Sequence, residues 1–356
     1  MTAPSQRSAP HATESNAIVL HIGVHKTGST SLQATLDAAR KALQSHDVLY
    51  PATGQGAAHH QAAWAVTGRT FGFGEEARKP DAKAWSRLVK ESRKYNHRVI
   101  ISSEFFGRMR AARVRELADR LGPDRLHVFF AVRPLVDLLP SSWQQYLKSG
   151  LTNTYQDWLQ QMLLTESSTV TPGFWARADF AALVKRWTAV LPPERITAVF
   201  LDPSDRDLLF NTTAALLDLP TQFLAQYRTG GPSNRSLTAP EAELVRQTNL
   251  LVRDSFGWND YADKIRQGAV KTIVETRAVP PDEQRIATPS WAIDLAIRRQ
   301  AKDHRVLTRS GIQLVGDPGI LLQPRTGSPA VDVTEIPADL AGLGVAAAAG
   351  YRPSSS

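Results

Sequence analysis

His21-Ile-Gly-Val-His-Lys-Thr-Gly-Ser-Thr-Ser-Leu-Gln33 is the part of the sequence that indicates the architecture most strongly. It continues a short apolar run that begins at Ala17 and is typical of a buried strand in a parallel sheet. Behind it, apolar residues recur at helical spacing, at Leu32, Leu36, Ala39 and Leu43. A strand, a glycine-bearing loop and a helix in this order predict the opening of an α/β domain.

The same alternation of strands and helices continues along the chain. Apolar runs predict strands over residues 98–102, 125–132 and 195–201. Helical patterns are expected over residues 81–95, 134–148 and 206–217. Alternation of this kind predicts a three-layer α/β fold, with a central parallel sheet flanked by helices on both faces.

Composition divides the chain into four expected segments. Residues 1–16 are polar and are expected to be a disordered lead, and residues 17–255 hold the α/β domain. Residues 256–324 are expected to be a mostly helical C-terminal extension, because the strand pattern fades there. Residues 325–356 are rich in Gly, Ala, Pro and Ser and are expected to be a flexible tail.

Charge and cysteine content restrict the functional classes. The chain has no cysteine, which excludes disulfides, thiolate metal sites and cysteine nucleophiles. Its net charge of +8 suits an anionic partner. The basic residues are spread out, without a dense cluster or interleaved aromatic residues, so a nucleic acid is not expected as the partner.

The N-terminal region indicates the expected location. Residues 1–16 lack the basic patch and apolar stretch of a secretory signal. The first apolar run, residues 17–24, is far shorter than the roughly 20 residues that a membrane span needs. We therefore expect a cytoplasmic protein without a transmembrane segment.

The loop over residues 21–33 has the chemistry of a phosphate site. Backbone N–H groups of a glycine turn and the positive end of the following helix together bind anions. Lys26 adds a full charge, and hydroxyl groups follow at Ser29, Thr30 and Ser31. The alternative is a strand–helix corner whose Lys and Ser side chains only face solvent.

The loop departs from that of nucleoside triphosphatases, which reads G-x-x-x-x-G-K-[ST]. Gly23 and Gly28 have the right spacing, but position 29 is serine and the lysine lies at position 26. We therefore expect a P-loop-like fold whose site does not hold magnesium–ATP in the usual geometry.

A second anion-binding pair is predicted at Arg133 and Ser141. Arg133 ends the strand predicted at 125–132, at the edge where open parallel sheets bind ligands. Ser141 lies eight residues later, about two helical turns or roughly 11 Å along the next helix. An arginine fork and a hydroxyl so placed can converge on one phosphate. The alternative is a surface pair of Arg133 with Asp137.

Taken together, the two motifs resemble the sulfotransferase family that uses 3′-phosphoadenosine 5′-phosphosulfate (PAPS), and the loop is similar to that of its bacterial, glycan-type members. The resemblance covers roughly residues 17–255. It implies that Arg133 and Ser141 hold the 3′-phosphate and that Lys26 neutralises the bridging oxygen as the sulfuryl group leaves. It also implies that the 5′-phosphate is held by Thr27, Gly28, Ser29, Thr30 and Ser31.

The resemblance also implies a catalytic base and a third cation. Ile100-Ile-Ser-Ser-Glu104 is similar to the strand end that carries a glutamate base in glycan-type members, so Glu104 is the expected general base. Otherwise Glu104 caps the next segment or pairs with Arg108. The turn-rich stretch 230–237 lacks the family's basic-glycine sequence, and Arg235 is the expected substitute over the 3′-phosphate.

Two adjacent histidines are further candidates. His59 is expected to bind the acceptor or to act as an alternative base, and His60 is the other choice. Neighbours on a helix point about 100° apart, so only one of them is expected to face the site. Adjacent histidines do not easily chelate one ion, and no metal site is expected.

The resulting hypothesis is a PAPS-dependent sulfotransferase acting on a hydroxyl or amine acceptor. PAPS is the expected co-substrate, and a carbohydrate or polysaccharide is the expected acceptor, with a lipid or small-molecule alcohol left open. Five tryptophans are candidates to line a sugar site: Trp64, Trp85, Trp143, Trp158 and Trp175. The alternatives are a P-loop nucleotide kinase and a non-catalytic nucleotide- or glycan-binding module of the same fold.

Overall fold

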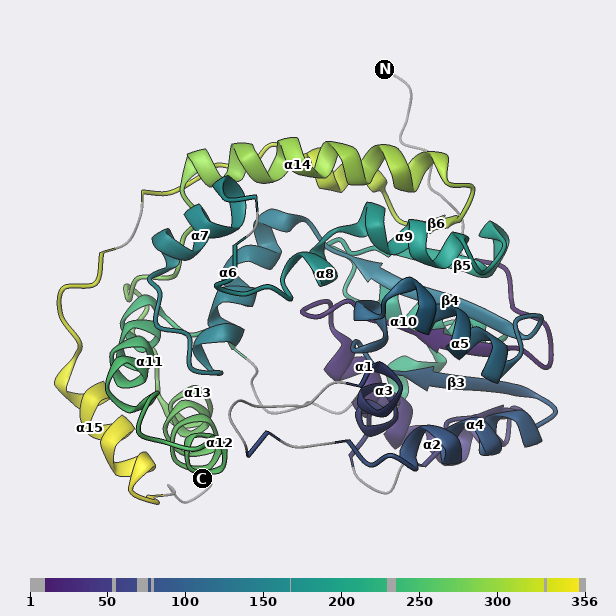
Figure 1. The fold of residues 1–356 in the computed structure, drawn as a ribbon, viewed down its shortest axis with the longest axis horizontal. Coiled ribbons are helices and arrows are strands. Elements are labelled where there is room, and N and C mark those ends of the chain that lie inside the picture. Colours follow the sequence, from purple (N-terminus) through teal and green to yellow (C-terminus); the bar gives the residue numbers. More distant parts are fainter. Residues whose placement is uncertain are drawn as a thin grey trace.

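The computed structural model of the chain describes residues 10–52, 56–68, 76–77, 80–166, 168–228, 235–329 and 332–351 (Figure 1). Its centre is a six-stranded sheet in the order β2-β3-β1-β4-β5-β6, and every neighbouring pair is parallel. The strands are β1 (Ile18–His21), β2 (Val48–Leu49), β3 (Arg98–Ser102), β4 (Leu126–Val132), β5 (Ile196–Phe200) and β6 (Gln313–Val315). The predicted α/β class with a parallel sheet is confirmed.

The inner strands are apolar on both faces because helices cover both faces of the sheet. In β4 every residue is buried, and Val128 and Phe130 pack into one core while Phe129 and Ala131 pack into the other. The register aligns Ile18 of β1 with Leu126 of β4. Continuous apolar runs were therefore the correct sequence signal for these strands.

One face of the sheet is covered by few helices. They contribute Leu32, Leu36 and Phe210, among others, to the smaller core. These elements are α1 (Ser29–Ala38), α2 (Arg40–Gln44), α10 (Leu208–Leu216) and η3 (Phe223–Tyr227).

The opposite face carries more helices and the larger core. In Figure 1, α14 runs along the top of the molecule above α9. The elements on this side are α3 (His60–Thr67), α4 (Ala84–Lys94), η1 (Phe106–Arg108), α5 (Ala111–Leu121), α6 (Leu135–Leu147), α7 (Tyr155–Leu164), α8 (Trp175–Ala178), α9 (Phe180–Thr188), η2 (Pro193–Arg195), α14 (Ser290–Arg309) and η5 (Pro318–Leu322).

A separate group of helices lies beyond the carboxyl ends of the strands, where the arrowheads of β3 and β4 point in Figure 1. Its first helix begins with a capping box between Thr238 and Glu241. The group comprises α11 (Ala239–Val252), α12 (Trp258–Asp260), the π-helix η4 (Tyr261–Val270), α13 (Lys271–Thr276) and α15 (Ala338–Ala348). In the described part of the chain, no helix combines the length and apolarity that a membrane span requires.

The C-terminal part of the chain contains two elements that the sequence did not reveal. The extension over residues 256–324 is mostly helical, as predicted, and it also contains β6, which pairs with β5 and completes the sheet. The tail predicted as flexible from residue 325 contains α15, which buries Leu340 and Ala347 against η4 and α13. Residues 1–9 of the expected lead, and 330–331 and 352–356 of the expected tail, lie outside the described residues.

The strand order places a topological switch at β1. The chain leaves β1 toward α1 on one face of the sheet, whereas it leaves β3 and β4 toward helices on the other face. Open α/β sheets bind ligands outside the carboxyl ends of the strands at such a point. The three segments singled out in the sequence follow β1, β3 and β4, so the fold brings them to one edge of the sheet.

Candidate active site

The loop after β1 requires glycine where it passes the chain after β3. Gly23 has a φ of +94°, and a Cβ there would lie 2.6 Å from Cβ of Glu104. No L side chain fits this approach, so the glycine allows the first loop to lie directly against Glu104. Lys26 also adopts a left-handed φ of 67°, which is uncommon for a residue with a side chain.

The polar side chains of this loop divide into two sets. Thr27 and Ser29 are buried, and both hydroxyls donate to the carbonyl of Val24, at 2.6 and 3.2 Å. Thr30 and Ser31 are exposed on the first turn of α1. The cap residue Gly28 provides no side-chain acceptor to this helix, so its first N–H groups are available to an anion.

Lys26 points from the loop toward α6. Its Nζ donates to Oε1 of Gln145 at 2.9 Å. Burial lowers the pKa of Lys26 to about 8, and the positive charges of Lys148, Arg177 and Arg266 act in the same direction. The ammonium therefore lies in a confined and strongly cationic environment.

Arg133 joins the second predicted motif to the first. Its Nη1 donates to the backbone carbonyl of Lys26 at 3.1 Å, and burial lowers the pKa of the guanidinium. Ser141 is on α6 as expected, but its hydroxyl donates to the carbonyls of Asp137 and Leu138 on its own helix. Arg133 and Lys26 are thus brought together, whereas the hydroxyl of Ser141 bonds to its own helix.

Glu104 follows β3 and lies beside the loop. Its Oε2 accepts from Nε2 of Gln33 at 3.0 Å, and its Oε1 is 3.8 Å from Nε2 of His60. Its side chain is 14% exposed. Among the described residues, His60 is the basic side chain within 4 Å of this carboxylate; burial lowers the pKa of His60, and the alternative pair of Glu104 with Arg108 is not formed. The carboxylate is thus partly accessible and lies against the loop at Gly23.

The two histidines have different positions. His59 is 1% exposed; its Nδ1 accepts from the N–H of Ser102 at 3.1 Å and its Nε2 donates to the carbonyl of Pro51 at 3.0 Å. Burial lowers the pKa of His59 to about 4, so its ring is neutral. Its two hydrogen bonds connect the backbone at Pro51 to the backbone at Ser102 in β3. The structure therefore places His60, rather than the predicted His59, beside Glu104.

Aromatic rings lie next to Glu104. Phe105 makes edge contacts with His25, His60 and Trp64, at centroid distances of 5.0, 5.0 and 5.3 Å. Of the five tryptophans named as sugar-site candidates, three are buried core residues: Trp85, Trp143 and Trp158. Trp64 is the one that reaches this cluster.

Three cations near Lys26 and a fourth near the adjacent His25 were not predicted as part of the site. Lys148 follows α6, Arg177 is on α8, Arg266 is on η4 and Arg108 is on η1. Burial holds the pKa of His25 well below its usual range, and the charges of Arg177 and Arg108 add to this effect. No local motif links these residues, because they come from four elements spread between residues 106 and 270. We call Lys26, Glu104, Arg133, His60 and these four cations the switch-point site.

Arg235, predicted to lie over the 3′-phosphate, pairs with an acidic residue of the helices beyond the sheet. Its guanidinium makes a two-pronged ion pair with buried Glu241, at 2.6 and 2.8 Å, and also donates to the carbonyl of Ile273. Arg277 contacts the same carboxylate at 3.0 Å. Arg235 therefore links the helices beyond the sheet, and residues 230–234 of its predicted loop lie outside the described residues.

Comparison with known proteins does not assign the chain. No family model matches it, and no curated protein matches it. Across the described ranges, no group of three or more His, Asp or Glu side chains is arranged to hold a metal ion. The fold and the site define a parallel α/β protein compatible with nucleotide binding, with half-buried cations gathered at the switch point.

Proposed function

We propose that this chain is a sulfotransferase that moves a sulfuryl group from PAPS to a hydroxyl or amine acceptor, with a carbohydrate or polysaccharide as the acceptor class. The observation that carries the proposal is the hydrogen bond from Arg133 to the backbone of Lys26. It joins the loops after β1 and β4, and Glu104 lies against the first of them. A donor with phosphates at two ends needs two such cationic loops.

The donor's 5′-phosphosulfate would lie against the loop after β1. The free N–H groups at the start of α1 and the ammonium of Lys26 supply the contacts there. The 3′-phosphate would lie toward Arg133, whose planar fork suits two phosphate oxygens.

The energetics also favour a bound polyanion. Burial lowers the pKa of Lys26, Arg133 and Lys148, which means that the folded chain holds these charges at a cost in free energy. In the described part of the chain, the ammonium of Lys148 has no hydrogen bond or ion pair of its own. A ligand with several negative charges would offset that cost. A strand–helix corner with only a structural role would have no need to hold these charges together.

In the proposed reaction the acceptor oxygen or nitrogen attacks sulfur and forms the new bond, while the bond from sulfur to the 5′-phosphate oxygen breaks. The proton of the acceptor passes to Glu104, which Gln33 and His60 orient. Lys26 and the loop N–H groups stabilise the negative charge that develops on the departing phosphate.

The aromatic residues support the acceptor class. Phe105 and Trp64 pack beside Glu104, and apolar ring surfaces with a few polar groups are usual in small-molecule sites. Such surfaces suit the C–H faces of a sugar whose hydroxyl is presented to the carboxylate.

Calorimetric titration tests the proposal. We expect adenosine 3′,5′-bisphosphate to bind at least about tenfold more tightly than 5′-AMP, a difference of about 1.4 kcal/mol. Tighter binding of magnesium–ATP than of the bisphosphate would contradict the proposal and favour a nucleotide kinase. Bisphosphate binding without sulfate transfer to any of a panel of saccharides, alcohols and amines would favour a non-catalytic binding module.

A further inference from the structure

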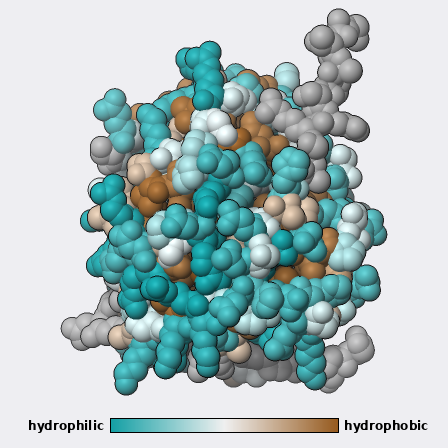
Figure 2. Space-filling model, turned by 90° about the vertical axis from the view of Figure 1, so that its right-hand side faces the viewer, coloured by the Kyte–Doolittle hydropathy of each residue, from teal (hydrophilic) through white to brown (hydrophobic). Residues whose placement is uncertain are grey.

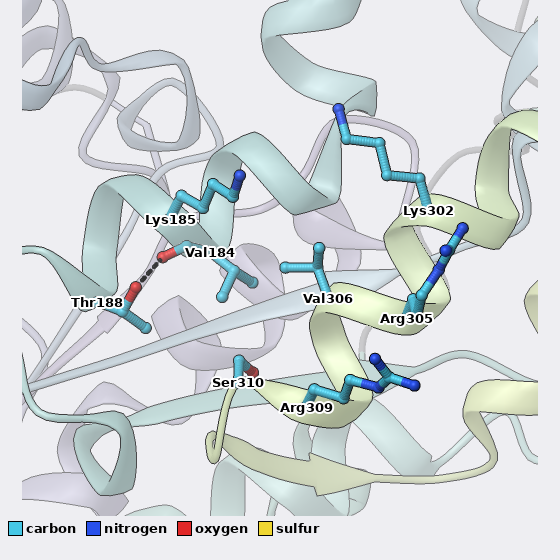
Figure 3. A pocket seen from close by; sticks show the side chains of 8 residues that line it. All are labelled: Val184, Lys185, Thr188, Lys302, Arg305, Val306, Arg309 and Ser310. Atoms are coloured by element: carbon cyan, nitrogen blue, oxygen red, sulfur yellow. Dashed lines mark hydrogen bonds between the residues drawn. The ribbon is translucent and has the colours of Figure 1, made fainter.

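A second cationic feature lies between α9 and α14, in a hollow of about 570 Å³ (Figure 3). Lys185 of α9 and three residues of α14, Lys302, Arg305 and Arg309, line it. Val184 and Val306 lie between the two helices and form an apolar floor. We call this feature the α9–α14 hollow.

The hollow is remote from the switch-point site. The C-terminal half of α9 leads through η2 to the start of β5, and the end of α14 leads to the start of β6. These are the amino ends of the strands, whereas Lys26, Glu104 and Arg133 follow the carboxyl ends. Figure 2 shows the face of the molecule at the amino ends of the strands. This face is mainly hydrophilic, with hydrophobic residues in separate patches.

The cationic side chains of the hollow are not paired in the described part of the chain. All four cationic side chains are exposed, and none has an ion pair or a side-chain hydrogen bond among the described residues. Asp303, the acid between Lys302 and Arg305 in sequence, is buried and accepts from the N–H of Ala181 at 2.8 Å. The inward turn of this carboxylate leaves the outer surface of α14 positive.

The spacing of the charges indicates how many anionic groups the ligand carries. Lys302, Arg305 and Arg309 lie on one face of α14, and seven residues span about 10 Å along a helix axis. One anionic group cannot contact all three, so the ligand needs at least two. The volume falls in the range of about 300–1,000 Å³ that is usual for small-molecule sites.

The floor restricts the ligand further. Val184 and Val306 offer aliphatic surface, and none of the described residues that line the hollow is aromatic. Binding of nucleobases or single-stranded nucleic acid usually relies on stacking against aromatic rings. We infer that the α9–α14 hollow binds a small molecule that carries two or more phosphate or sulfate groups on a saturated carbon skeleton.

Titration of the full chain with fructose 1,6-bisphosphate tests this inference. We expect the bisphosphate to bind at least about tenfold more tightly than fructose 6-phosphate or inorganic phosphate, since the hollow offers cations to both ends. Sucrose octasulfate, tested in parallel, distinguishes sulfate from phosphate esters. Equal affinity for the mono- and bisphosphate, or binding of a DNA duplex but of none of these esters, would overturn the inference.

A matched pair of charge reversals locates the binding. Lys302→Glu and Lys41→Glu each reverse an exposed helical lysine, but Lys41 is on α2, across the sheet from the hollow. We expect Lys302→Glu to weaken the bisphosphate at least about tenfold and Lys41→Glu less than about twofold, because exposed charges are screened beyond roughly 10 Å. Equal losses in the two variants would show only a response to net charge and would contradict the inference.

Two further variants test whether the ligand occupies the hollow itself. Arg133→Ala alters the switch-point site and should leave binding of fructose 1,6-bisphosphate unchanged. Loss of binding in this variant would indicate that the ligand binds at the carboxyl ends of the strands and would contradict the inference. Val306→Phe fills the hollow while it keeps all four cations. With its melting temperature measured alongside, we expect a folded protein that no longer binds, and retained binding would exclude the hollow as the site.

Discussion

The switch-point site and the α9–α14 hollow are both cationic, but they are built in opposite ways. At the first, loops after β1 and β4 are joined by a hydrogen bond and burial lowers the pKa of Lys26 and Arg133. At the second, exposed side chains stand on the surfaces of regular helices. Charge alone therefore does not distinguish a site for chemistry from a binding surface. Burial, backbone contact and a nearby carboxylate mark the first as the candidate for chemistry.

Glu104 gives the largest expected difference between the two sites, because none of the described residues that line the hollow is a carboxylate. We expect Glu104→Gln to lower the rate of sulfate transfer by about 10²–10⁴-fold, the usual contribution of a general base. The amide keeps the size of the side chain and its bond with Gln33, so affinity for adenosine 3′,5′-bisphosphate should not change. Transfer rates and titrations on the same preparations measure both effects. Normal sulfation by this variant would remove Glu104 from the mechanism.

Arg133 tests whether the two loops act as one site. Arg133→Ala should weaken adenosine 3′,5′-bisphosphate by about 10–150-fold, since a hydrogen bond to a charged group contributes about 1.5–3 kcal/mol. Arg133→Lys keeps the charge but not the fork, and we expect it to recover part of the affinity. A loss for 5′-AMP as large as that for the bisphosphate would indicate that Arg133 does not contact the 3′-phosphate.

His59 and His60 separate a structural contact from a functional one. His59→Ala leaves the N–H of Ser102 and the carbonyl of Pro51 without partners, and each buried unpaired group costs about 1–3 kcal/mol in the free energy of unfolding. His60→Ala should instead lower sulfate transfer with a smaller change in stability, because His60 is half-buried beside Glu104. Denaturant unfolding and transfer rates on both variants measure this. The reverse pattern would restore His59 as the functional histidine.

The sequence predicted those parts of the fold whose signal is local. Strands β1, β3, β4 and β5 are buried apolar runs, and their ends place Lys26, Glu104 and Arg133 at one edge of the sheet. β2 and β6 have only two and three residues, too few for a periodic pattern. In α15 the residues are mostly small, and the helix is held by packing against η4 and α13.

Side-chain direction was harder to predict than position. His59 precedes the first residue of α3, so the phase of that helix decides which histidine faces Glu104, and the sequence does not reveal it. Lys148, Arg177 and Arg266 approach Lys26 from three separate elements, and only tertiary packing brings them together. Arg235 lies in the expected region, but Glu241 binds its guanidinium.

Titration of Lys26 is expected to give the smallest of these effects, a dependence of ligand affinity and of stability on pH. Its folded pKa of about 8 lies below the usual 10.5, so the ammonium is charged at neutral pH and loses its proton as the pH rises through about 8. Affinity for adenosine 3′,5′-bisphosphate should therefore fall between pH 7 and 9, and Lys26→Arg should remove most of that slope because arginine stays protonated.

In the absence of ligand, the stability of the protein should change with pH in the opposite direction. Above pH 8 the unfolded chain binds more protons at Lys26 than the folded chain does, so the free energy of unfolding gains a rising contribution up to about pH 10.5. Lys26→Met should remove that rise and raise the melting temperature at pH 7, where the wild-type charge is buried. Titrations and thermal unfolding across this pH range check both signs, and a pH-independent affinity in the wild type would remove Lys26 from contact with the anion.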